Sequence, residues 1–148
     1  MTGPAPLSRI AGPVLWAEDN LQDQILIRAA YEEVADAPPL AFVNDGVYLL
    51  EELHKGRPRL VVLDLKMPRL GGLETLRRVR SESEWNDLPV CIFSAGNQPD
   101  ETEACQALGA LEVVQKPIDF ELFTAAVQKI ASRARQALVG PAPLAAVP

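Results

Sequence analysis

Short runs of apolar residues alternate with helix-like patterns over most of the chain. Five of these runs have the length and continuity of buried β-strands, at residues 14–17, 41–43, 60–63, 89–93 and 113–114. The stretches that follow have apolar residues three and four positions apart, which predicts helices over residues 21–34, 47–53, 73–79, 101–108 and from 120 onward. The pattern therefore indicates five strand–helix units in succession.

The predicted strands are continuous apolar runs without alternating polar residues. Such strands are buried on both faces, so we expect an α/β fold in which a five-stranded parallel sheet carries helices on both faces. In the last helix, Asp119 is the expected N-cap. We expect one face of that helix to pack in the core, formed by Phe120, Phe123, Val127 and Ile130. Sheets of this kind bind ligands beyond the carboxyl ends of their strands.

Three carboxylates follow two of the predicted strands. Glu18 and Asp19 come directly after the first strand, and Asp64 comes directly after the third. If these strands are neighbours, the carboxylates converge at one edge of the sheet, where their mutual repulsion requires a cation. Oxygen ligands suit a hard cation such as Mg²⁺, and an aspartate can attack phosphorus to form an aspartyl phosphate. The pattern indicates that Asp64 is both a metal ligand and a nucleophile.

Two further strand ends carry groups that suit a phosphoryl group. Ser94 follows the fourth strand and offers a hydroxyl, and Lys116 follows the fifth and offers a cation on a long stem. Each residue is commonplace alone, because an aspartate after a strand is more often a turn former and a lysine is more often a surface charge. Their occurrence together at the strand ends favours one shared phosphoryl-accepting site.

The length and composition predict one domain with terminal extensions. Of the 148 residues, we assign 1–13 to a Pro/Gly-rich N-terminal arm, 14–138 to the domain and 139–148 to a Pro/Ala-rich C-terminal tail. The formal net charge of −6 argues against nucleic-acid binding, which depends on Lys and Arg. We find neither a secretory signal nor an apolar run long enough to span a membrane, so we expect a cytoplasmic protein without membrane contact.

The motifs at the strand ends resemble those of the receiver domains of two-component response regulators. The resemblance covers the chain from about Val14 to Leu138. Its matching segments are Val-Leu-Trp-Ala-Glu-Asp-Asn (14–20), Leu-Val-Val-Leu-Asp-Leu-Lys-Met-Pro (60–68), Gly-Gly (71–72), Phe-Ser-Ala-Gly (93–96) and Gln-Lys-Pro (115–117). The resemblance implies a flavodoxin-like (βα)5 fold.

The resemblance also implies how a metal ion is held. Asp19 corresponds to a direct ligand of Mg²⁺ or Mn²⁺, and Glu18 to an acidic residue that acts mainly through water. Asp64 and the backbone carbonyl of Lys66 correspond to the remaining protein ligands.

The same resemblance assigns the phosphoryl chemistry. Asp64 is similar to the phospho-acceptor, Ser94 to the switch hydroxyl and Lys116 to the phosphate-binding lysine. Many receivers have an aromatic residue three positions before the lysine, where this chain has Val113. This departure indicates that signalling uses backbone shifts near Ser94 or dimer repacking instead of an aromatic flip.

The resemblance further implies the partners. The phosphoryl donor would be a sensor histidine kinase or a phosphotransfer protein, and the chain itself would be no enzyme beyond self-phosphorylation from small donors and autodephosphorylation. The segment from Glu18 onward and the stretch 83–87 are similar to single-domain regulators that pair with phytochrome-type kinases. Those relatives tend to dimerise, so we expect a homodimer through the face of the fourth helix, fifth strand and fifth helix.

Two other functions are compatible with such a fold. A pseudo-receiver would keep the fold as a phosphorylation-independent binding or dimerisation module, and the presence of Glu18, Asp19, Asp64, Ser94 and Lys116 argues against it. A phosphatase-like enzyme with an aspartyl-phosphate intermediate would need an insertion that encloses a small substrate, and the sequence has none.

Overall fold

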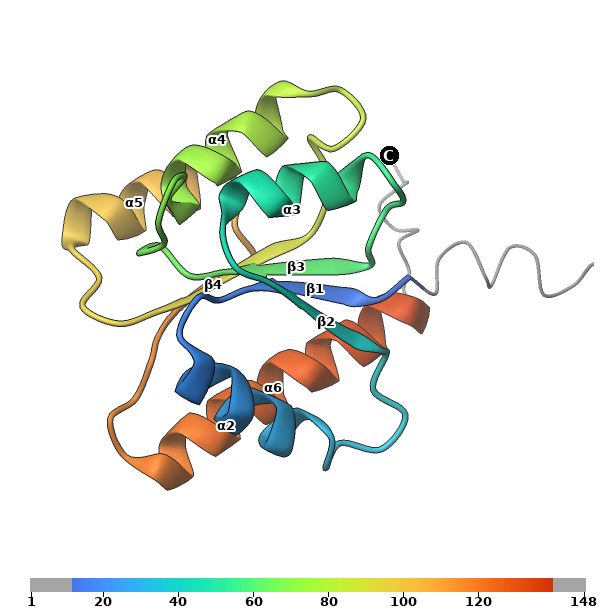
Figure 1. Ribbon diagram of the computed structural model, residues 1–148, viewed down its shortest axis with the longest axis vertical. Helices are drawn as coiled ribbons and strands as arrows, with labels where there is room; N and C mark the ends of the chain where they lie inside the picture. The colour runs from blue at the N-terminus through green and yellow to red at the C-terminus, as the bar shows by residue number, and fades with distance from the viewer. Residues whose placement is uncertain (1–11, 140–148) are drawn as a thin grey trace, which may run out of the picture.

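The five apolar runs form the strands of one parallel sheet. The computed structural model describes residues 12–139, and its strands lie in the order β2-β1-β3-β4-β5 (Figure 1). The strands are β1 (Val14–Ala17), β2 (Leu40–Val43), β3 (Leu60–Leu63), β4 (Val90–Ser94) and β5 (Glu112–Gln115). The helices are α2 (Leu21–Tyr31), α3 (Gly46–Leu53), α4 (Gly72–Ser81), α5 (Pro99–Ala107) and α6 (Phe120–Val139). The predicted α/β fold is therefore confirmed.

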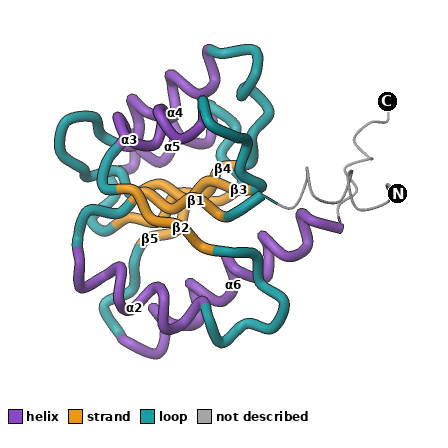
Figure 2. The backbone as a smooth tube through the Cα atoms, turned by 45° about the vertical axis from the view of Figure 1, so that its right-hand side comes forward, coloured by secondary structure: helices purple, strands orange, loops and turns teal. Residues whose placement is uncertain are grey.

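Helices cover both faces of the sheet. The helices α3, α4 and α5 lie on one face, and α2 and α6 lie side by side on the other (Figures 1 and 2). Alternate strand residues feed the two layers: Trp16 and Val62 pack with α2 and α6, whereas Leu15 and Val61 pack with α3, α4 and α5. Burial on both faces explains why the strands are continuous apolar runs.

The first helix departs from its predicted extent. It ends at Tyr31 instead of residue 34, and the Tyr31 hydroxyl donates a 2.7 Å hydrogen bond to the carbonyl of Pro38. Leu21 and Ile25 are 69% and 62% exposed, while the buried face of α2 contains Ile27, Ala30 and Tyr31. Apolar residues occur on both sides of this helix, so their spacing alone does not identify the side that meets the sheet.

One residue of the predicted α6 core face was assigned wrongly. Phe123, Val127 and Ile130 are buried as expected, but Phe120 is 63% exposed. It lies in the first turn of α6, where it lines a surface groove instead of the core. The N-cap prediction is correct, because Asp119 Oδ1 accepts a 3.0 Å hydrogen bond from the Leu122 N–H.

The predicted terminal arm and tail fall almost entirely outside residues 12–139. Over the residues that the structure does describe, no helix is both long and apolar enough to cross a membrane.

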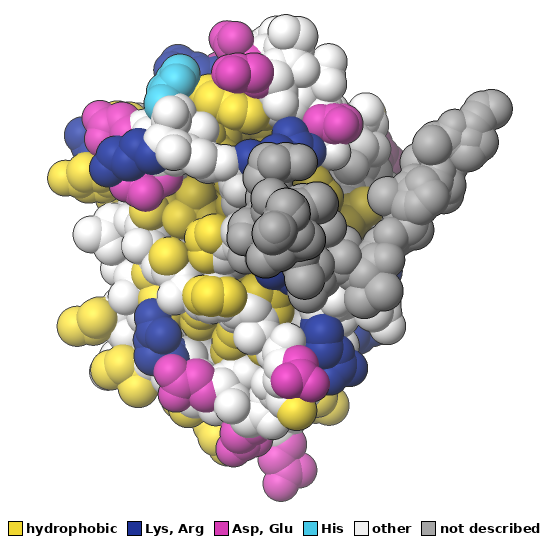
Figure 3. All heavy atoms as spheres, turned by 90° about the vertical axis from the view of Figure 1, so that its right-hand side faces the viewer, with side chains coloured by type: hydrophobic (Ala, Val, Ile, Leu, Met, Phe, Trp, Pro, Cys, Tyr) yellow, Lys and Arg dark blue, Asp and Glu magenta, His cyan; other side chains and the backbone are white. Residues whose placement is uncertain are grey.

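On the face shown in Figure 3, basic and acidic side chains are interspersed, with apolar side chains between them.

The parallel register brings the candidate residues to one edge. Ala17 pairs with Leu63, so Glu18 and Asp64 follow neighbouring strands at the same level. Ser94 pairs with Gln115, which places Lys116 directly beyond the end of β4. Strand pairing alone therefore aligns the polar residues at the carboxyl edge of the sheet.

Helix α4 begins very close to the end of β3. The N–H of Gly72 donates a 3.0 Å hydrogen bond to the Leu65 carbonyl. A Cβ atom at Gly72 would collide with the carbonyl oxygen of Asp64 and lie 2.8 Å from the Cα of Leu65. Glycine at this position therefore allows the loop after Asp64 to pack against the helix.

We expect Gly72→Ala to lower the free energy of unfolding by about 2 kcal/mol, because the added methyl group displaces backbone atoms. The matched control is Gly56→Ala, since a Cβ at Gly56 meets no described atom within 4 Å. That control should change stability by less than about 1 kcal/mol. Urea unfolding measures both values, and equal stabilities for the two variants would contradict the close approach.

Candidate functional site

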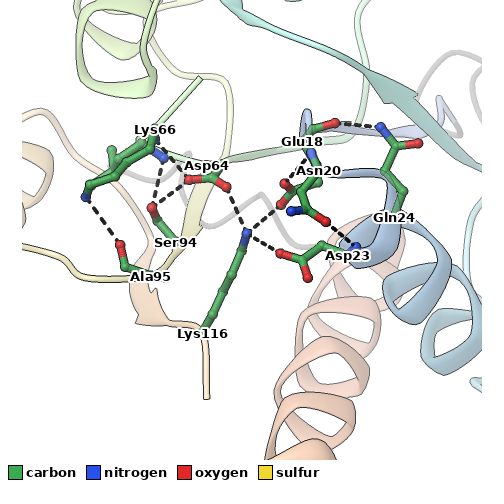
Figure 4. Close-up of polar contacts among 10 residues, drawn as sticks. Glu18, Asn20, Asp23, Gln24, Asp64, Lys66, Ser94, Ala95 and Lys116 are labelled. Atoms are coloured by element: carbon green, nitrogen blue, oxygen red, sulfur yellow. Dashed lines mark hydrogen bonds and ion pairs between the residues drawn. The ribbon is translucent and has the colours of Figure 1, made fainter. Parts of the chain in front are cut away.

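Asp64 lies at the centre of a polar cluster at the carboxyl edge of the sheet (Figure 4). Asp64 is only 5% exposed. Oδ1 accepts hydrogen bonds from the Ser94 hydroxyl at 2.6 Å and from the Lys66 N–H at 3.0 Å, and Oδ2 accepts one from Lys116 Nζ at 2.8 Å. The carboxylate is therefore held in one orientation by donors from three strand ends.

Glu18 and Asp19 complete an acidic cluster with Asp64. Carboxylate oxygens of the three residues lie within 4.8 Å of one another. Glu18 is fully buried, whereas Asp19 is exposed to solvent. Glu18 Oε1 lies 2.7 Å from Lys116 Nζ without the alignment of a hydrogen bond. Three converging carboxylates carry more negative charge than one ammonium offsets, and their oxygens suit a hard divalent cation.

The ammonium group of Lys116 lies among the carboxylates of this cluster and offsets part of their negative charge. Its Nζ lies 2.8 Å from Asp64 Oδ2, 2.8 Å from Asp23 Oδ2 and 2.7 Å from Glu18 Oε1. The first two contacts are aligned as hydrogen bonds. Burial disfavours the ammonium, but the three carboxylates outweigh burial and hold the pKa of Lys116 above its ordinary value. The lysine therefore stays charged.

Glu18 has a raised pKa because its side chain is buried. Burial raises the pKa of Glu18 from 4.5 to about 7, and Lys116 only partly opposes this shift. Near neutral pH, Glu18 therefore exchanges between a proton and a negative charge. A divalent cation in the cluster would favour the charged form.

Ser94 connects Asp64 to the loop that follows β4. Its hydroxyl donates to Asp64 and accepts a 3.1 Å hydrogen bond from the Leu65 N–H, and the residue is fully buried. The adjoining Lys66 side chain bonds the carbonyls of Ala95 and Gly96, each at 3.2 Å. Movement of the loop after β3 or of the loop after β4 would therefore change the contacts of the Asp64 carboxylate.

All the predicted side chains meet in one place, and the structure adds one residue for which no role was predicted. Asp23, in the first turn of α2, is the further carboxylate on Lys116. Its signal in the sequence is weak, because acidic residues are common in the first turn of any helix. The Lys66 carbonyl stays a predicted metal ligand, since the contacts found for Lys66 involve its N–H and its side chain.

Comparison with known proteins finds response regulators among the similar sequences. Response regulator MprA of Mycobacterium leprae (strain TN) is 37% identical over 92 residues, which are 62% of this chain and 40% of that protein. The match therefore spans less than half the length of this relative.

Solved structures share the fold. The Mn(2+)-bound form of response regulator Rcp1 has a TM-score of 0.77 at 23% identity, covering 82% of this chain and 92% of that one. The phosphorylated cyanobacterial phytochrome response regulator RcpA has a TM-score of 0.75 at 24% identity, covering 80% and 90%. The response regulator receiver domain family matches residues 14–128. The chain therefore belongs to the response regulator receiver domain family.

Proposed function

We propose that this receiver domain accepts a phosphoryl group on Asp64 and signals through changed contacts with partners. The observation that carries the proposal is the pairing of Asp64 with Lys116 and Ser94 beside two further carboxylates. This arrangement combines a nucleophile, a fixed positive charge and a hydroxyl donor, which are the groups that an aspartyl phosphate requires.

The transfer needs little covalent chemistry from the protein. A carboxylate oxygen of Asp64 forms a bond to phosphorus while the bond from phosphorus to the donor breaks, and the donor leaves with that electron pair. When the donor is a phosphorylated histidine, the departing imidazole nitrogen takes a proton from solvent. Lys116 and Ser94 hold the oxygens in position, and positioning with charge stabilisation dominates reactions of this class.

We assign the metal ligands to the acidic cluster. Asp19 and Asp64 would bind Mg²⁺ or Mn²⁺ directly, Glu18 would act through water, and the Lys66 carbonyl would add a backbone oxygen. The cation would offset negative charge on the phosphoryl oxygens. The convergence of the three carboxylates supports this assignment, as does the Mn(2+)-bound state of the similar Rcp1 structure.

The donor is proposed to be a sensor histidine kinase or a phosphotransfer protein. Similarity to the phytochrome response regulator RcpA favours a phytochrome-type kinase. We propose a cytoplasmic regulator whose own chemistry is limited to self-phosphorylation from small donors and autodephosphorylation. We also propose a homodimer through α5, β5 and α6, where α6 exposes Leu122, Ala125 and Lys129.

Incubation with Mg²⁺ and acetyl phosphate should add one phosphoryl group to the protein, because Asp64 is oriented for attack. Intact-mass spectrometry measures the gain, and Asp64→Asn should show none. Full labelling of Asp64→Asn would contradict the assignment. A wild-type protein that takes up no phosphoryl group, although folded, would instead favour a phosphorylation-independent binding module.

The pH dependence of stability should report on Glu18. Its raised pKa means that the folded state binds more protons than the unfolded state between pH 4.5 and about 7. This contribution is fully present below pH 4.5 and is lost as the pH rises through 7. Without divalent metal, wild-type stability should therefore fall relative to Glu18→Gln by roughly 2–3 kcal/mol across that window.

The two proteins should also differ in their response to Mg²⁺. The cation should stabilise the wild type more at pH 8 than at pH 5, because a proton competes with it for Glu18. Chemical denaturation at each pH measures these differences. Parallel pH profiles for wild type and Glu18→Gln would show that Glu18 does not titrate in this range.

The proposed dimer should depend on the exposed face of α6. Sedimentation at micromolar concentration with Mg²⁺ and acetyl phosphate should show a species twice the 16.1 kDa chain mass. Leu122→Glu should give the single-chain mass, since it places a charge in the interface. Ile25→Glu is the control, because Ile25 has the same 62% exposure as Leu122 but belongs to α2, which is not part of the proposed interface. A single-chain species under all conditions would refute the dimer.

A further inference from the structure

We infer that Asp23 is a positioning residue for Lys116, holding the ammonium in place while Asp64 is phosphorylated. The inference rests on the proposed phosphoryl transfer to Asp64. Asp23 comes from α2, a different element from the strand ends that provide the other site residues. Figure 4 shows its carboxylate pointing at Lys116 from the side opposite Asp64.

Asp23 differs from the other two carboxylates on Lys116. Glu18 and Asp64 belong to the cluster that would bind a divalent cation, and Asp23 does not. When a cation binds, oxygens of Glu18 and Asp64 gain a competing positive charge, and after transfer Asp64 carries a phosphoryl group. Asp23 is then the carboxylate that keeps its 2.8 Å contact with the ammonium. It leaves the other N–H groups of Lys116 available to the phosphoryl oxygens.

The local structure of α2 directs Asp23 to this role. An acidic residue at this helical position often reaches back to the N-cap N–H in a capping box. Here the N-cap is Asn20, and its N–H donates a 3.0 Å hydrogen bond to Glu18 Oε2 instead. The Asn20 side chain accepts a 2.9 Å hydrogen bond from the Asp23 N–H, which fixes the Asp23 backbone. The Asp23 carboxylate is thereby free to bind Lys116.

Burial gives this contact its strength. The Lys116 side chain is 9% exposed and that of Asp23 is 26% exposed, so the pair is largely removed from water. Charge-assisted hydrogen bonds in such surroundings are stronger than on the surface. A lysine side chain has four rotatable bonds, and the anchor limits where its ammonium can go. The ammonium stays protonated throughout, and Asp23 acts on the reaction only by holding it.

A double-mutant cycle tests the inference. Rates of phosphoryl uptake from acetyl phosphate are measured at saturating Mg²⁺ for wild type, Asp23→Asn, Lys116→Met and the double variant. We expect Asp23→Asn to slow uptake between about ten- and a hundredfold, since small misplacements at a reacting centre have effects of this size. In the Lys116→Met background, the same change should have less than about a twofold effect, because the group it positions is gone.

Two controls accompany the cycle. Glu121→Gln removes an exposed first-turn acid of α6 and should leave uptake unchanged. Asp23→Glu keeps the charge and should recover part of the rate. A second measurement stays informative if Lys116→Met labels too slowly to quantify. Reductive methylation of Lys116, mapped by mass spectrometry, should be faster in Asp23→Asn than in wild type or Glu121→Gln, because the ammonium is less restrained.

The outcomes separate this inference from the proposed function. A wild type that takes up no phosphoryl group means that the proposed function has failed. A labelled wild type with Asp23→Asn at the same rate, or equal slowing with and without Lys116, overturns the role of Asp23 alone. Unchanged methylation of Lys116 in Asp23→Asn would overturn it as well.

Discussion

The ion pairing of Lys116 is the interaction on which the site depends. A parallel sheet brings the ends of its strands to one edge, and here those ends carry carboxylates that repel one another. Lys116 contacts three carboxylates within 2.8 Å and is itself almost fully buried. One cation cannot neutralise so many negative charges, and the remaining imbalance favours a divalent metal ion. The excess of negative charge therefore lowers stability when metal is absent, and it also favours metal binding.

Burial within this acidic cluster explains the unusual state of Glu18. A fully buried carboxylate with a pKa of about 7 destabilises the fold when it is charged. Binding of a proton or a cation removes this destabilisation. Functional sites commonly contain groups whose pKa values are shifted by burial and by neighbouring charges, because a shifted pKa suits such a group to its chemistry. In this domain the destabilised carboxylate is Glu18, which follows the first strand, whereas Asp64, the proposed phospho-acceptor, accepts hydrogen bonds from three donors.

Much of this arrangement was predictable from the sequence, for identifiable reasons. Strands buried on both faces are visible as apolar runs, and site residues at strand ends follow directly from them. Surface details were not predictable in the same way. Phe120 continues the apolar spacing of α6 but lies beyond the core, and Leu21 and Ile25 fall on the exposed side of α2. Asp23 was missed because its role depends on Asn20 using its N–H elsewhere, which only tertiary structure reveals.

The groups that surround Asp64 connect its carboxylate to the loop that follows β4. The Ser94 hydroxyl bonds Asp64, and the Lys66 side chain bonds the carbonyls of Ala95 and Gly96. The proposed function requires that the phosphoryl group is on Asp64. Borohydride reduction of the phosphorylated protein converts an aspartyl phosphate into homoserine, which peptide mass spectrometry can place in the sequence. Homoserine at position 64 alone is the predicted result, and homoserine at another carboxylate would contradict the account.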